Sequence, residues 1–182
     1  MTGTVQRPLL FLDVDGPLIP FGTTSRPHPT YGTDPGTPGA GANPLLTRID
    51  PRHGPRLAAL PCELVWATTW GEDANAWVAP RVRLPPLPVV SWPEPSEADG
   101  TAGVEDQDER DGLHWKTRAL VARAAGRPFV WVDDEITDTD RAWVAAHHPG
   151  PALLHRVDPR QGLADSDYTA IDAWLRNEAD DS

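Results

Sequence analysis

The stretch "LLFLDVDGPL", residues 9–18, decides the fold. Its four leading apolar residues show no alternation with polar ones, which indicates a strand over residues 8–14 that is buried on both faces. Asp13, Asp15 and Gly16 follow directly. Because ligands of an open parallel sheet bind outside the carboxyl ends of its strands, we expect both carboxylates to face a crevice.

Length and charge limit the class of protein. A chain of 182 residues is long enough to form one domain with a substantial core. The formal charge of −11 disfavours a broad footprint on nucleic acid or anionic membrane. Cys62 is the only cysteine, which excludes an intramolecular disulfide and favours a reducing cytoplasm. No stretch approaches the roughly 18 apolar residues that cross a bilayer. We therefore expect a soluble, cytoplasmic, single domain over residues 1–182.

Predicted helices and strands alternate after the first strand. They are a helix over 51–60, a strand in "CELVWATTW" (62–70) ending near Thr68, helical spacing in "EDANAWVA" (72–79), a short strand around Val89 and Val90, a helix over 113–126, a strand over 128–135, a helix over 138–148, a strand over 151–157 and a helix over 166–178. This order predicts an α/β fold of three layers, with a Rossmann-like parallel sheet of about five strands and helices on both faces.

Two segments are predicted as loops. Residues 20–45 are so rich in Gly, Pro and Thr that we expect a long loop or flap, with room for a short hairpin but not for a helix or central strand. Residues 94–111 are acidic and poor in apolar side chains, which predicts a solvated, mobile loop.

Polar side chains follow three predicted strands at ends that a parallel sheet brings to one edge. They are Asp13 and Asp15, then Thr68 and Thr69, then Asp133 and Asp134, and Lys116 lies near the start of the helix before the last pair. Carboxylates, a hydroxyl and an amine suit phosphoryl transfer with Mg2+, which prefers oxygen ligands and lets clustered carboxylates stay ionised. One carboxylate can take the phosphoryl group, and another can move the proton.

Four motifs resemble those of the haloacid dehalogenase (HAD) superfamily. "FLDVDGPL" (11–18) is similar to its first motif, Asp-x-Asp-Gly after a buried strand, and "LVWAT" (64–68), "HWKTRAL" (114–120) and "FVWVDDEITD" (129–138) follow in family order. "WATTWGEDAN" (66–75), "LPPLP" (84–88) and "WVDDE" (131–135) further resemble the HAD domain of Swiss Army Knife RNA repair proteins. The resemblance covers about residues 8–138.

The resemblance implies the catalytic roles. Asp13 would be the nucleophile and a metal ligand, and Asp15 the general acid and base, with its backbone carbonyl also on the metal. Thr68 would bind phosphate, with Thr69 beside it, and Lys116 would steady both phosphate and nucleophile.

The resemblance also implies a Mg2+ site in the acidic fourth motif. Asp134 is the preferred ligand there, Asp133 its partner and Asp138 a further candidate. Gly16 would turn the backbone tightly beside the metal and the phosphate. Pro17 departs from the family pattern, which has a small or β-branched residue at this position.

Each motif also has a purely structural interpretation. Residues 13–16 could form an ordinary turn, since Asp and Gly favour turns. Thr69 could cap the helix that starts near Glu72, and Asp133 and Asp134 could cap the helix after them. Lys116 could be a solvated charge, while Trp70 lies close enough to the crevice to stack on a nucleobase. None of the six histidines is assigned a role.

These features are compatible with three hypotheses about function. Neither predicted loop resembles a folded cap domain, which implies an open site for a nucleic-acid end, a phosphoprotein or a small phosphorylated molecule held by loops. The first hypothesis is a Mg2+-dependent phosphatase. The second is a catalytically idle domain that binds a protein partner through the metal site or the acidic loop. The third is phosphotransfer to an acceptor other than water. No membrane contact and no DNA-binding module are predicted.

Overall fold

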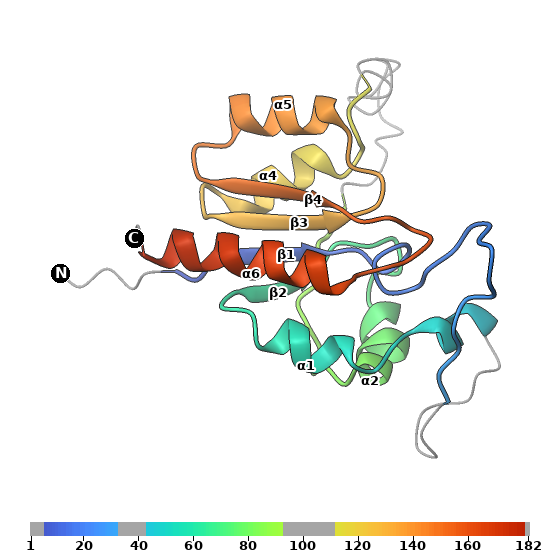
Figure 1. Cartoon of the computed structure of the whole chain (residues 1–182). Helices are drawn as coiled ribbons and strands as arrows, with labels where there is room; N and C mark the ends of the chain where they lie inside the picture. Colours follow the sequence, from blue (N-terminus) through green and yellow to red (C-terminus); the bar gives the residue numbers. More distant parts are fainter. Residues whose placement is uncertain (1–5, 33–42, 93–111, 181–182) are drawn as a thin grey trace.

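A four-stranded parallel sheet forms the centre of the molecule (Figure 1). The computed structural model describes residues 6–32, 43–92 and 112–180. Its strands are β1 (Leu9–Leu12), β2 (Glu63–Trp66), β3 (Phe129–Asp133) and β4 (Ala152–Arg156), in the order β2-β1-β3-β4. This confirms an α/β fold with a parallel sheet, consistent with a Rossmann-like arrangement.

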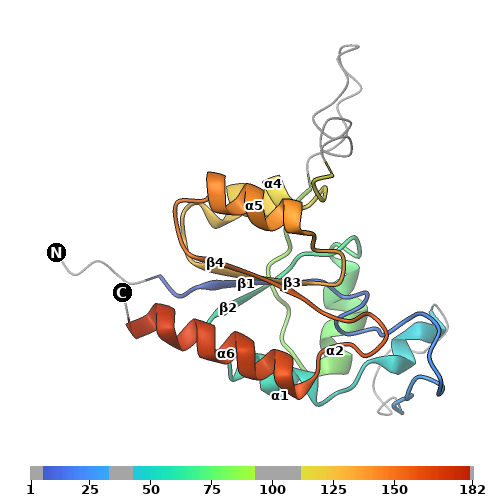
Figure 2. The same cartoon turned by 45° about the horizontal axis from the view of Figure 1, so that its top comes forward.

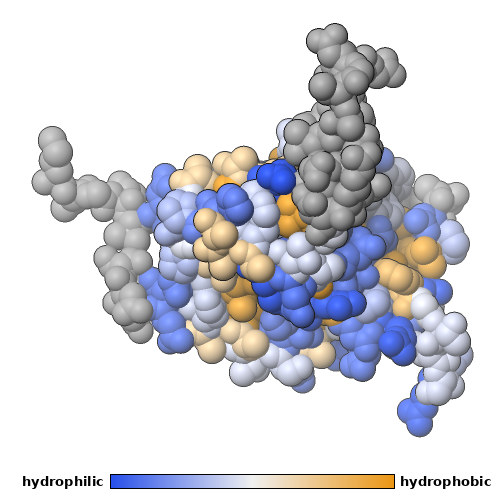
Figure 3. All heavy atoms as spheres, turned by 90° about the horizontal axis from the view of Figure 1, so that it is seen from above, coloured by the Kyte–Doolittle hydropathy of each residue, from blue (hydrophilic) through white to orange (hydrophobic). Residues whose placement is uncertain are grey.

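Helices cover both faces of the sheet (Figures 1 and 2). On one side lie α4 (Thr117–Ala124) and α5 (Asp138–His147), and on the other lie α1 (His53–Ala58), α2 (Ala79–Val82) and α6 (Asp165–Asp180). Alternate residues of β1 point to opposite faces, so Phe11 joins the core beside α4 and α5 while Leu10 and Leu12 join the core beside the other helices. The outer surface over α4 and α5 carries small apolar patches among hydrophilic residues (Figure 3).

The predicted count of about five strands is wrong. The expected strand around Val89 and Val90 forms a single isolated bridge with β2, in which Val90 N donates to Trp66 O at 2.9 Å and Trp66 N donates to Pro88 O at 2.8 Å. The segment contains three prolines in "LPPLP" (84–88), and proline has no N–H to donate to a strand ladder. The edge of the sheet at β2 therefore carries one bridge rather than a fifth strand.

The helices differ from prediction mainly at their starts. The predicted helix over 72–79 is a π-helical turn, Ala74–Val78, followed by α2. The predicted helix over 113–126 begins only at Thr117, which leaves Lys116 at the N-cap position rather than inside the helix. It ends as expected, because Ala125 and Gly126 take left-handed φ values of 50° and 85°.

The predicted loop over 20–45 is confirmed in its first part and wrong at its end. Residues 20–32 form neither helix nor strand, but a 3-10 helix, Pro44–Arg48, begins inside the predicted range. Asn43 starts it by accepting a hydrogen bond from Leu45 N at 2.9 Å. Residues 33–42 and the predicted acidic loop over 94–111 lie outside the described residues. Within the described ranges, no helix has both the length and the apolar character needed to cross a membrane.

Candidate active site

The sheet brings two acidic strand ends together. Asp13 directly follows β1, Asp133 ends β3, and the two strands are paired in register up to Leu12 and Val132. Asp13 N then donates to Val132 O at 3.0 Å, so the two strand ends continue side by side. The chain order reverses between β1 and β3, and this is the position in an open α/β sheet where ligands bind.

Lys116 joins these two strand ends. Its Nζ lies 2.9 Å from Asp13 Oδ2 and 2.8 Å from Asp133 Oδ2, and the residue is only 2% exposed. Burial alone would lower the pKa of Lys116, but the two carboxylates outweigh burial and raise it above its ordinary value. Lys116 is also the only lysine in the chain, so the remaining basic residues, apart from the histidines, are all arginines.

Asp13 lies in a buried position with two fixed contacts. Besides Lys116, Val14 N donates to its Oδ1 at 2.8 Å. Burial raises the pKa of Asp13 to about 7, an effect that Lys116 opposes and Asp133 reinforces. The ionised form of this carboxyl therefore depends on positive charge nearby.

The carboxylate of Asp133 is already occupied by hydrogen bonds. Its Oδ2 accepts from Lys116 Nζ and also from Trp131 Nε1 at 3.2 Å, while its Oδ1 accepts from Glu135 N at 3.0 Å. The residue is fully buried. Asp133 thus has the contacts of a residue that holds Lys116 in place.

Asp134 presents its carboxylate to the same site. Burial first, and then the charge of Asp133, raise the pKa of Asp134 to about 6. Carboxylate oxygens of Asp13, Asp133 and Asp134 lie within 4.8 Å of one another. All are oxygen donors on acidic groups, so this set fits a hard divalent cation such as Mg2+.

Gly16 leaves room for Asp134. A Cβ atom on Gly16 would lie 2.6 Å from Asp134 Oδ1, and Gly16 has a φ of +88°, which favours glycine. Arg156 Nε, from the end of β4, donates to the Asp134 backbone oxygen at 2.8 Å. The turn after β1 and the turn after β3 therefore fit closely against each other.

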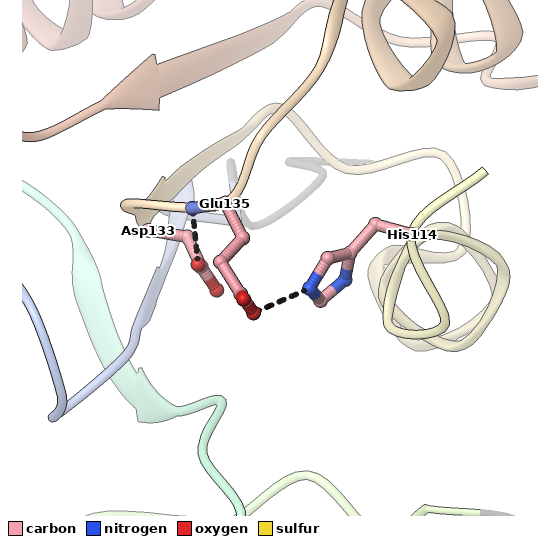
Figure 4. A group of neighbouring side chains, drawn as sticks. All are labelled: His114, Asp133 and Glu135. Atoms are coloured by element: carbon pink, nitrogen blue, oxygen red, sulfur yellow. Dashed lines mark hydrogen bonds and ion pairs between the residues drawn. The ribbon is translucent and has the colours of Figure 1, made fainter. Parts of the chain in front are cut away.

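A second group with possible metal-ligand atoms consists of His114, Asp133 and Glu135 (Figure 4). His114 Nε2 lies 3.2 Å from Glu135 Oε2, and His114 Nδ1 accepts a hydrogen bond from Lys116 N at 3.2 Å. Both ring nitrogens of His114 thus have a hydrogen-bond partner, Glu135 Oε2 at Nε2 and Lys116 N at Nδ1. This group is a hydrogen-bonded support for Lys116, a role that the sequence did not indicate for His114.

Asp15 is held by a tryptophan. Trp70 Nε1 donates to Asp15 Oδ2 at 2.9 Å, and the Trp70 ring packs against the core beside α1 and α2. Asp15 also forms an isolated bridge with Ile19, which closes the turn after β1. The sequence placed Trp70 near the crevice, but it gave no sign that the indole N–H binds this carboxylate.

The two threonines after β2 lie in different surroundings. Thr68 is fully buried, its Oγ1 accepts from Trp70 N at 3.3 Å, and its backbone oxygen accepts from Trp92 Nε1 at 3.1 Å. Thr69 is exposed. The alternative role of Thr69 as a helix cap is wrong, because the following helical turn has Asp73 at its N-cap position.

The caps of α5 are also not those predicted. Thr137 and Asp140 form a capping box, so Asp133 and Asp134 do not cap this helix. Asp140 is fully buried and also accepts from His114 N at 2.8 Å and Thr117 Oγ1 at 2.7 Å. The sequence signal for this cap is the local pattern Thr-x-x-Asp at residues 137–140. Asp138 is exposed in the first turn of α5 and pairs with Arg141, so it does not join the acidic cluster.

Comparisons with protein families, with curated proteins and with solved structures found no match to this chain.

Proposed function

We propose that this chain is a Mg2+-dependent phosphatase that hydrolyses a phosphate monoester through an aspartyl phosphate on Asp13, as its resemblance to the HAD superfamily implies. The observation that carries the proposal is the Lys116 ammonium bound between Asp13 and Asp133 at the point where the chain order of the sheet reverses, with Asp134 beside them. A cluster of this composition suits phosphoryl transfer, which depends mainly on positioning and on charge stabilisation.

The proposed reaction has two displacements. In the first, a carboxylate oxygen of Asp13 attacks phosphorus, the bond to the ester oxygen breaks, and Asp15 gives its proton to the leaving alcohol. In the second, Asp15 takes a proton from water, the water oxygen attacks the phosphorus, and the bond to Asp13 breaks to release inorganic phosphate. The contacts of Lys116 and Val14 N orient the Asp13 carboxylate for both steps.

Asp13 and Asp134 would hold Mg2+, together with the backbone carbonyl of Asp15. Asp133, whose carboxylate is occupied by hydrogen bonds, would act as their partner by fixing Lys116. When bound, the cation supplies positive charge that keeps the carboxylates ionised together and neutralises the phosphoryl oxygens.

Lys116 and Thr68 would hold the remaining phosphoryl oxygens. The Thr68 hydroxyl accepts from Trp70 N and retains its O–H as a donor. Gly16 provides space at the turn beside Asp134, and Thr69 would contribute at the exposed rim. The substrate class is a phosphorylated small molecule or a nucleic-acid end, and the latter rests on the resemblance to RNA repair proteins.

Turnover tests the proposal directly. We expect the purified chain with Mg2+ to release phosphate from an aryl phosphate, from nucleotides or from phosphorylated oligonucleotide ends, and we expect EDTA to stop the release. Asp13→Asn should abolish it, while Asp138→Asn, which removes an exposed acid outside the cluster, should not. Turnover that survives in Asp13→Asn would overturn the proposal, and so would its absence on every substrate. Transfer to added alcohols instead of water would identify a phosphotransferase.

Metal binding gives a second measurement. Mg2+ should raise the thermal stability of the wild-type chain and of Glu135→Gln, because Glu135 is not among the proposed ligands and its carboxylate pairs with His114 Nε2. The increase should be lost in Asp134→Asn. An equal increase in thermal stability in Asp134→Asn would show that Asp134 is not a ligand of the cation.

A further inference from the structure

An open polar cavity lies in the loop that follows β1. Its volume is about 480 Å3, within the range of small-molecule sites. Residues 22–28 and Thr30 of the loop line it together with Arg48 of the 3-10 helix. Figure 1 shows this segment, in blue, on the side where the strands end. Among the described residues, the lining offers hydroxyl groups, a histidine and two arginines, and no carboxylate.

Two arginines, Arg26 and Arg48, line this cavity. In the described part of the structure, neither Arg26 nor Arg48 has a carboxylate partner, although the chain carries a net charge of −11. Other arginines are paired with acids within 4 Å, namely Arg52, Arg56, Arg127, Arg141, Arg160 and Arg176. A guanidinium group can bind a carboxylate or phosphate through two parallel N–H donors, so two arginines in one cavity suit an anionic ligand.

Hydrogen bonds hold the walls of the cavity in place. Arg48 Nη1 donates to Pro20 O at 2.8 Å, and Tyr31 N donates to Thr47 O at 2.7 Å, so both ends of the loop are fixed to the 3-10 helix. His28 Nε2 donates to Gly22 O at 3.0 Å and closes the loop on itself. Phe21 N donates to Pro159 O at 2.8 Å and anchors the loop to the segment after β4.

We infer that this cavity is a binding site for a phosphate-type oxyanion, separate from the Asp13 cluster. Arg26 and Arg48 would supply the charge, because a guanidinium offers paired N–H donors that match the oxygens of a phosphoryl group. The hydroxyls of Thr23 and Ser25 supply further donors on the same wall, while Thr24 Oγ1 donates to Arg26 O and helps to fix the loop. This inference does not depend on the proposed phosphatase activity.

The test is a titration of the full-length chain with inorganic phosphate in EDTA, followed by the backbone amide signals in NMR spectra. The Asp13→Asn variant is the background, so the result stands whether or not the Asp13 cluster is catalytic. We expect the amides of Gly22–Thr30 to shift saturably, with a Kd on the order of 1 mM. Arg26→Gln should weaken this binding by about tenfold, the effect of one charge-assisted hydrogen bond.

The matched control is Arg52→Gln, which removes an exposed arginine paired with Asp50 and should leave the affinity unchanged. Equal binding in Arg26→Gln would overturn the inference, as would a linear shift that never saturates or the same shift with chloride at equal ionic strength. Because Arg48 also ties the loop to the helix, Arg26→Gln is the deciding variant.

A bisphosphorylated sugar distinguishes two sources of the anion. If one molecule of the sugar places one phosphate in the cavity and the other at the Asp13 cluster, the amides of Gly22–Thr30 and of Val14–Gly16 will shift with one common affinity. The cavity then binds a phosphate group of the substrate. If the two sets of amides titrate with different affinities, the cavity binds a free oxyanion.

Discussion

Trp70 donates its indole N–H to the carboxylate of Asp15 at 2.9 Å and so joins the segment after β2 to the turn after β1. The two residues are 55 positions apart in the chain. Since Asp15 is the proposed proton carrier, this bond fixes one of its oxygens relative to Asp13. Trp70 is therefore a positioning residue in the proposed reaction.

Trp70→Phe removes this donor and keeps an aromatic ring in the core. We expect kcat to fall by about tenfold with little change in KM, since a hydrogen bond to a charged group contributes about 1.5 kcal/mol. Trp77→Phe is the control, because Trp77 packs in the same core. An equal kcat in the two variants would show that the indole bond does not position Asp15.

Lys116→Met leaves Asp13 and Asp133 as buried carboxylates without their shared cation. We expect the free energy of unfolding in urea to fall by about 3–5 kcal/mol in the presence of EDTA. Adding Asp13→Asn to this variant should recover part of the loss, because one uncompensated charge is removed. A loss below about 1 kcal/mol, typical of a surface ion pair, would contradict the burial of this cluster.

Gly16→Ala and Gly71→Ala separate backbone strain from steric contact. Both glycines have positive φ values, +88° and +53°, so both variants should lose about 1 kcal/mol in unfolding free energy. A Cβ on Gly71 meets nothing within 4 Å, whereas a Cβ on Gly16 meets Asp134 Oδ1 at 2.6 Å. Gly16→Ala should therefore lose about 1–3 kcal/mol more and should weaken the stabilisation by Mg2+. Similar losses in both variants would argue against the contact with Asp134.

Asp140 gives the fold a defined pH dependence. Burial acts to raise its pKa, but hydrogen bonds from Thr137, Thr117 and His114 N outweigh burial and hold the pKa below 3.8. Its stabilisation is therefore complete above pH 3.8 and is lost as the pH falls through the lower, folded value. We expect Asp140→Asn to lose about 2 kcal/mol at neutral pH and to approach wild type in acid.

The control for this prediction is Asp138→Asn, two residues away and exposed, which should stay within about 0.5 kcal/mol of wild type. Unfolding in urea at several pH values measures both variants. A difference between Asp140→Asn and wild type that does not shrink in acid would contradict the ionised, hydrogen-bonded state of Asp140.

The sequence predicted the strands and their parallel arrangement better than the contacts between side chains. Consecutive apolar residues before Asp13 predicted a doubly buried strand, and parallel pairing then brought Asp13 and Asp133 to one edge. The fifth strand was overpredicted, because apolar residues in "LPPLP" and after it outweighed the missing N–H groups of the prolines. Composition and spacing show which residues are apolar, but they do not show which backbone hydrogen bonds those residues can form.

Contacts between distant segments were beyond the sequence. The apolar pattern placed Lys116 near the crevice, yet its exact partners depend on how the start of α4 meets the ends of β1 and β3. The bond between Trp70 and Asp15 depends on a side-chain rotamer and on the turn after β2. The capping box of Thr137 and Asp140, by contrast, was visible as a local pattern.

Because Lys116 is the single lysine and is buried, cleavage after it can report local opening of the structure at the start of α4. An endoprotease that cuts only after lysine has one target bond, after Lys116, and it cannot reach this bond while the ammonium lies between two carboxylates. The cleavage rate therefore measures how often the start of α4 separates from the sheet. Any ligand that binds the closed cluster should slow this cut, so one proteolysis assay could screen for substrates without knowledge of the chemistry.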